Sequence, residues 1–138
     1  MVGEGGPADE GGELAEPGAP EPSGSLECRS KVWLERDGRV ALSEWRVSLL
    51  EAIDEMGSLA RAAERMKVPY RTAWYKLREI RDCLGVTLVE TQSGGAEGGG
   101  TQLTPEAREI VARFRRVTRG LAAMTDQRFR AEFGDLLK

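Results

Sequence analysis

The chain has 138 residues, with 20 Lys and Arg against 23 Asp and Glu, no histidine and a net charge of −3. The length fits one folded domain, and the lack of histidine removes the commonest general base and metal ligand. The two cysteines, Cys28 and Cys83, match no metal or redox spacing. We therefore expect no enzymatic activity, no metal and no cofactor.

No apolar run approaches the ~20 residues of a membrane-spanning helix, and the N-terminus lacks the apolar stretch of a signal peptide. The sequence thus predicts a protein without a membrane partner, in a reduced, cytoplasmic setting.

Residues 1–27 hold seven acidic residues, no basic one, seven glycines and four prolines. Such a segment buries too little apolar surface to offset its chain entropy, so residues 1–28 are expected to be a disordered acidic tail. Without residues 1–27 the rest of the chain has a net charge of +4. On charge grounds the tail is either a solvated extension or an arm that competes with DNA for a basic face.

The next segment predicts a small hairpin and a supporting helix. Alternating side chains before and after Asp37-Gly38, a type I′ turn pair, indicate two short strands within residues 29–42. Ser43 is placed to cap a helix that continues to about Met56, and Gly57 is placed to end it.

Residues 58–84 show two helical patterns joined only by Lys67-Val68. Ser58 is a suitable cap for the first, and Pro69 suits the first turn of the second. The second helix has an apolar stripe with spacing 4, 3, 4, made of Ala73, Leu77, Ile80 and Leu84. With the small Ala62 and Ala63 available for a close crossing, the pattern is typical of a helix-turn-helix.

This segment is also basic. Residues 58–81 hold seven basic and two acidic residues, a local charge of +5 that suits a surface meeting phosphates. The outward face of the second helix carries Arg71, Thr72, Tyr75, Lys76 and Arg78. Trp74 sits beside the buried stripe, and we expect it in the core.

Residues 86–90 are strand-like, residues 91–100 are rich in glycine, and residues 101–103 can return as a partner strand. A hairpin directly after a recognition helix predicts the wing of a winged helix, whose glycines let the tip approach a DNA backbone. The alternative, a phosphate-binding nucleotide loop, lacks the Gly-Lys-Ser/Thr sequence and the required context. A loop without any contact remains the other alternative.

The last segment begins with Thr104 as cap and Pro105 at the first helical position. Apolar residues then recur with spacing 4, 3, 4, 3, at Ile110, Phe114, Val117, Leu121 and Met124. Packing against the same domain would use such a stripe, but further apolar residues follow to Leu137, so we predict a dimer helix over residues 104–138.

Several motifs together resemble the DNA-binding domain of the molybdate-responsive ModE regulators, a relative of the LysR-type winged helix. They are GSLARAAERM, VPYRTAW, LVET with its glycine loop, and LTPEAREI. The resemblance covers roughly residues 31–121 and implies a homodimer that reads palindromic DNA. Two-domain members of that family carry molybdate on a separate C-terminal β-barrel. We expect this chain, which ends at Lys138, to lack that module, so oxyanion sensing is not carried over and any small-molecule effector stays open.

The expected fold is mostly α with small β hairpins: a winged helix-turn-helix at residues 29–103, then the dimerisation helix. The expected partners are double-stranded DNA and a second copy of the chain. Tyr70, Arg71, Thr72 and Tyr75 would face bases, whereas Lys67, Lys76, Arg78 and the wing would hold phosphates. The full set of predicted DNA contacts adds Ser58, Thr91, Gly94 and Gly95. The alternative is a protein-interaction module on a winged-helix scaffold that does not read DNA.

Overall fold

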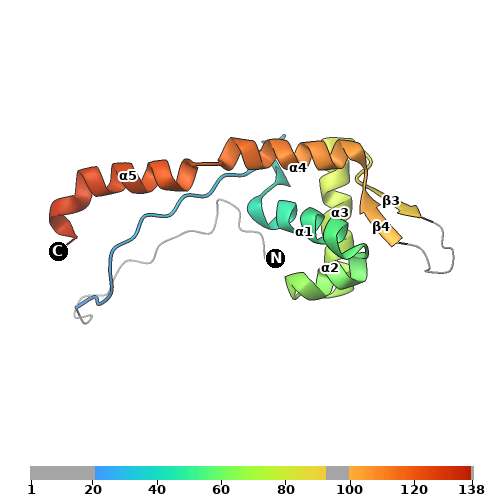
Figure 1. The fold of residues 1–138 in the computed structure, drawn as a ribbon, viewed down its shortest axis with the longest axis horizontal. Helices are drawn as coiled ribbons and strands as arrows, with labels where there is room; N and C mark the ends of the chain where they lie inside the picture. Colours follow the sequence, from blue (N-terminus) through green and yellow to red (C-terminus); the bar gives the residue numbers. More distant parts are fainter. Residues whose placement is uncertain (1–20, 93–99, 138) are drawn as a thin grey trace.

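The structure is a computed structural model that describes residues 21–92 and 100–137. Its helices are α1 (Glu44–Met56), α2 (Leu59–Met66), α3 (Tyr70–Leu84), α4 (Pro105–Thr118), α5 (Leu121–Phe133) and the short η2 (Gly134–Leu136). Its strands are β1 (Leu34–Arg36), β2 (Arg39–Leu42), β3 (Val89–Gln92) and β4 (Gly100–Leu103). Figure 1 shows α1, α2 and α3 gathered beneath α4, with the β3–β4 hairpin at one end and α5 extending the other way. This is the predicted fold class.

Most of the predicted tail, residues 1–20, lies outside the described residues, and residues 21–33 form neither helix nor strand. The β1–β2 hairpin confirms the predicted turn, because Asp37 (φ 55°) and Gly38 (φ 78°) are both left-handed, as a type I′ turn requires. Strand β1 is shorter than predicted and has an irregularity between Leu34 and Glu35.

Side-chain caps determine where the first two helices begin. The Ser43 hydroxyl accepts a hydrogen bond from the Arg46 N–H at 3.2 Å, and the Ser58 hydroxyl accepts one from the Arg61 N–H at 3.1 Å. Gly57, at φ 70°, ends α1 as predicted. Pro69 lies one residue before α3 rather than inside it, because its ψ of 150° is extended.

The core consists of two packed clusters. One joins α1, α2 and α3 through the small residues Ala62, Ala63 and Ala73, which allows the close crossing predicted for the helix pair. The other joins β2, α1, α3, the β3–β4 hairpin and α4, and contains Leu50, Ile80, Leu88, Leu103 and Phe114. Cys83 is also buried.

Antiparallel pairing of β3 with β4 forms the wing, with Val89 opposite Leu103 and Gln92 opposite Gly100. Strand β3 begins later than predicted, and residues 86–88 link it to α3. Thr104 holds this link, because its N–H donates to the Leu88 carbonyl at 2.9 Å and its hydroxyl donates to the Thr87 carbonyl at 2.8 Å.

The predicted long C-terminal helical segment is present, with an interruption. Thr104 and Pro105 begin α4 as expected, but Arg119 is extended and Gly120 has φ 82°, so the chain starts a new helix at Leu121. Phe114 is 2% exposed and packs in the core of its own chain, which corrects its assignment to a dimer interface. Among the described residues, no helix is long and apolar enough to cross a bilayer.

Two charged contacts hold α4 against α1. The Arg115 guanidinium donates to both Glu51 oxygens, at 3.1 and 2.7 Å, and to Glu44 at 2.7 Å. The Arg108 guanidinium donates to both oxygens of Asp54 at 2.9 Å, and the Leu103 N–H donates to the same carboxylate at 3.1 Å. The hydrogen bond from Arg108 is the main cause that lowers the pKa of Asp54 below its ordinary value of 3.8, against the opposing effect of burial.

Replacing Asp54 by asparagine should lower the free energy of unfolding by about 1 kcal/mol at neutral pH, since the paired groups are partly solvated. A lowered pKa in the folded state contributes stability that is complete above the unfolded pKa and is lost as pH falls through the folded pKa. The two proteins should therefore differ in stability at pH 7, and the difference should shrink as pH falls through the lowered pKa of Asp54 in the folded state. Urea denaturation across a pH series measures this, and a constant difference down to low pH would contradict the role of Asp54.

Candidate DNA-binding surface

Helix α3 presents one continuous outward face. Arg71, Trp74, Tyr75 and Arg78 follow the i, i+3, i+4, i+7 spacing that places side chains on one side of a helix, and all four are exposed. Ala73 and Ile80 lie on the opposite side and are fully buried. We call these four residues the α3 face.

Trp74 corrects the prediction that placed it in the core, because its side chain is 40% exposed. It lies between the buried stripe and the outward side of α3. Its ring packs edge-on against Tyr75, with centroids 5.3 Å apart and planes at 78°, and the Arg78 guanidinium carbon lies 5.3 Å from its centroid. The indole therefore lies at one edge of the α3 face, in contact with Tyr75 and Arg78.

The cations around this face fall into two groups. Within the part of the chain that the structure describes, Arg61, Lys67 and Arg71 are exposed and have no ion-pair partner. Arg65 instead pairs with Glu55 at 2.6 Å, and Arg81 pairs with Asp82 at 3.0 Å. Arg78 contacts the Trp74 ring and likewise has no ion-pair partner among the described residues, so the uncompensated charge lies on α2, on the α2–α3 turn and along the α3 face.

Lys76 belongs to the compensated group, which corrects its predicted role as a phosphate contact. Its ammonium lies 3.7 Å from Glu79, and its side chain is only 15% exposed. Glu79 also accepts a hydrogen bond at 2.9 Å from the buried Arg46, whose guanidinium donates to the Val40 carbonyl as well. This network ties α3 to α1 and to the first hairpin, so Lys76 serves packing between elements.

The other predicted DNA contacts lie at the start of α2, in the first turn of α3 and on the wing. Tyr70 is 55% exposed at the start of α3, whereas Thr72 is half-buried and lies away from the α3 face. Ser58 uses its hydroxyl to cap α2. Thr91 is exposed on the wing, and the predicted wing-tip contacts Gly94 and Gly95 lie outside the described residues.

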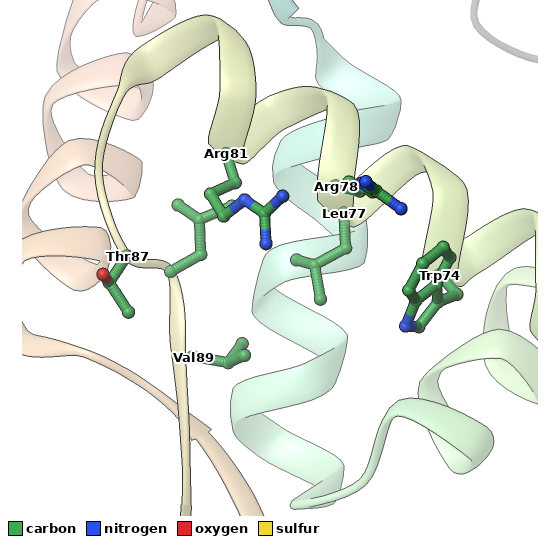
Figure 2. A pocket seen from close by; sticks show the side chains of 7 residues that line it. Trp74, Leu77, Arg78, Arg81, Thr87 and Val89 are labelled. Atoms are coloured by element: carbon green, nitrogen blue, oxygen red, sulfur yellow. The ribbon is translucent and has the colours of Figure 1, made fainter.

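A groove of about 360 Å³ separates α3 from the segment that leads into β3. Figure 2 shows Trp74, Leu77, Arg78 and Arg81 projecting from α3 on one side of it, with Val89 facing them from the wing. Sequence reasoning missed Arg81 and Thr87 as members of this site. The 74, 77, 78, 81 spacing was the available signal for Arg81, but only the packing of the hairpin against α3 brings Thr87 there.

Comparison with known proteins also indicates a helix-turn-helix DNA-binding domain. Residues 46–108 match the bacterial regulatory helix-turn-helix proteins of the lysR family. The molybdenum transport protein ModE of Azotobacter vinelandii is 41% identical over 86 residues, which are 62% of this chain and 32% of that protein. ModE of Herbaspirillum seropedicae is 42% identical over 72 residues, which are 52% of this chain and 27% of that protein.

A solved structure of full-length CbnR complexed with its target DNA matches 67% of this chain and 31% of that chain, with 25% identity and a TM-score of 0.51. The chain carries a ModE/LysR-like winged-helix DNA-binding domain. It spans about a third of the length of the ModE proteins it matches. In a winged helix-turn-helix the second helix of the pair, here α3, is the recognition helix and the following hairpin, here β3–β4, is the wing, so the α3 face and the uncompensated cations lie on the parts that meet DNA in such a fold.

Proposed function

We propose that the chain is a transcriptional regulator that binds specific duplex DNA as a homodimer, with α3 in the major groove. The observation that supports this most strongly is the α3 face. It combines two guanidinium groups with two aromatic rings on one exposed side of a recognition helix, and arginine and aromatic groups can contact base edges.

The charge arrangement supports the same proposal. Arg61, Lys67 and Arg71 flank the N-terminal end of α3 and can approach phosphates without first breaking an ion pair. The two carboxylates of α3, Glu79 and Asp82, are already paired with cations of this chain. A DNA backbone would therefore meet little uncompensated negative charge on this helix.

The homodimer part of the proposal rests on the C-terminal helices. Helix α5 has no buried residue, and it extends away from the domain (Figure 1). Val117 and Met124 are 55% and 48% exposed, and Phe133 and Leu136 are also exposed. A second copy would cover these apolar groups and place two recognition helices on one side of the duplex, about one helical turn apart.

The alternative is a winged-helix module that binds another protein and does not read DNA. The salt dependence of binding distinguishes the two functions, because contacts between the uncompensated cations and phosphates release counterions.

We expect a fluorescence anisotropy titration with duplex DNA to show binding that weakens steeply as salt rises. Replacing Lys67 by alanine should reduce the slope of log K against log[salt] by about 0.9, the value for one phosphate contact. Lys76→Ala is the matched control, and it should leave the slope nearly unchanged because Lys76 is already paired with Glu79.

Failure of the wild-type chain to bind any duplex at low salt would overturn the proposal in favour of the protein-interaction module. If Lys76→Ala reduced the slope as much as Lys67→Ala, the division into compensated and uncompensated cations would be wrong.

A further inference from the structure

Trp74 is a large apolar side chain on a surface that should otherwise favour charge. It is not part of either core cluster, and it lies one turn from both Arg71 and Arg78 on the α3 face. Its side chain is 40% exposed, so a large part of the indole is open to a bound molecule. Its position calls for an apolar group on the bound molecule.

The indole is also held in place before anything binds. Tyr75 packs edge-on against it, and the Arg78 guanidinium lies 5.3 Å from its ring centroid. These two contacts restrict both the ring and the guanidinium. Groups that are ordered in advance lose less conformational freedom on binding, so Trp74 and Arg78 are placed to act as one unit.

The major groove offers one apolar group to such a ring, the C5-methyl of thymine. The guanidinium of Arg78 has five N–H donors, and a cation over an aromatic face keeps them available for a bidentate pair with guanine O6 and N7. The Arg78 guanidinium carbon lies 5.3 Å from the Trp74 ring centroid, and bases on one strand are spaced by about 3.4 Å, so the two groups reach base pairs one to two steps apart.

We infer that Trp74 and Arg78 together select a thymine next to a guanine in each half-site, with Trp74 against the thymine methyl and Arg78 on the guanine. The inference rests on the proposed function. It adds that Trp74 determines sequence specificity and that Arg78 contacts a base and not a phosphate. The carboxylates of α3 do not compete for Arg78, because Asp82 pairs with Arg81 and Glu79 pairs with Arg46.

The test begins by selecting the preferred duplex from a random library with the full chain. That duplex should contain a thymine beside a guanine in each half-site. Replacing this thymine by deoxyuridine removes only the methyl group and should weaken binding about fourfold, the amount expected for one buried carbon. In Trp74→Ala the thymine and deoxyuridine duplexes should bind equally, whereas Trp74→Phe should keep part of the difference.

Arg78→Ala is the matched variant for the second half of the inference. It should relax the preference at the guanine and keep the distinction between thymine and deoxyuridine. Thermal melting of each variant checks that the variant is folded before its binding is compared.

If Trp74→Ala weakens the two duplexes and keeps a fourfold ratio between them, Trp74 contacts the backbone or another protein, and the inference fails while the proposed function stands. If the selected site contains no thymine beside a guanine, the inference fails as well. A wild-type chain that binds no duplex at all would overturn the proposed function itself.

Discussion

Replacing Phe114 by alanine is expected to lower the free energy of unfolding by about 3–5 kcal/mol, the usual cost of removing a buried aromatic side chain. Phe114 is 2% exposed and belongs to the cluster that joins α4 to α1 and α3. The same change at Val117, three residues later on the exposed side of α4, should cost under about 0.5 kcal/mol in the monomer. Urea denaturation of both variants at one low protein concentration compares them directly.

Substitutions at Phe114 and Val117 test two different properties, the folding of the domain and the association of two copies. Val117→Asp should leave the domain folded and raise the dissociation constant of the dimer on the order of a hundredfold or more, because a charge would be buried between copies. Light scattering over a concentration series measures this. Equal losses of stability for Phe114→Ala and Val117→Ala would contradict the placement of Phe114 in the core. A Val117→Asp variant that stays dimeric would exclude this face of α4 from the interface.

Replacing Arg71 by alanine is expected to cost about 1–3 kcal/mol in binding to the preferred duplex and to relax the preference at one base position per half-site. Arg71 is exposed near the start of α3, on the side opposite Ala73 and Ile80, and has no ion-pair partner among the described residues. Its guanidinium is therefore free to form a bidentate pair with a guanine.

Arg65→Ala is the matched control for this measurement. Arg65 lies on α2 and already pairs with Glu55 at 2.6 Å, so its removal should change binding to preferred and scrambled duplexes only slightly. If Arg71→Ala weakens both duplexes to the same degree, Arg71 contacts a phosphate, and base reading falls to the rest of the α3 face and to Tyr70.

Hydrogen bonds from backbone N–H groups join the wing to α1 and to the turn that follows α1. Thr101 of β4 donates its N–H to the Gly57 carbonyl at 2.9 Å, which anchors the wing to the turn before α2. Asp54 holds the other end of β4 through the Leu103 N–H. These two contacts fix β4 relative to α1, and the wing in turn forms one wall of the groove beside α3.

Local sequence signals were sufficient for most of the fold. Ser43, Ser58 and Thr104 begin their helices through hydrogen bonds to residues three positions ahead, and Asp37-Gly38 forms the turn that its residue types prefer. Each of these features depends on neighbours within a few residues, so the pattern alone predicts it. The helix-turn-helix follows from the same kind of signal, since its helices are joined by so short a link.

The sequence alone predicted most of the elements, their order and the basic character of residues 58–81, but not the break between α4 and α5. Tertiary structure decided which charges remain available and which apolar side chains are covered. Glu79 pairs with Lys76 three positions before it, but only the folded chain brings Arg46, 33 positions away in the sequence, to the same carboxylate. Phe114, predicted at an interface, is buried in the core, and Trp74, predicted in the core, is exposed. Helical periodicity gives the direction of a side chain, but its burial depends on which other element packs there.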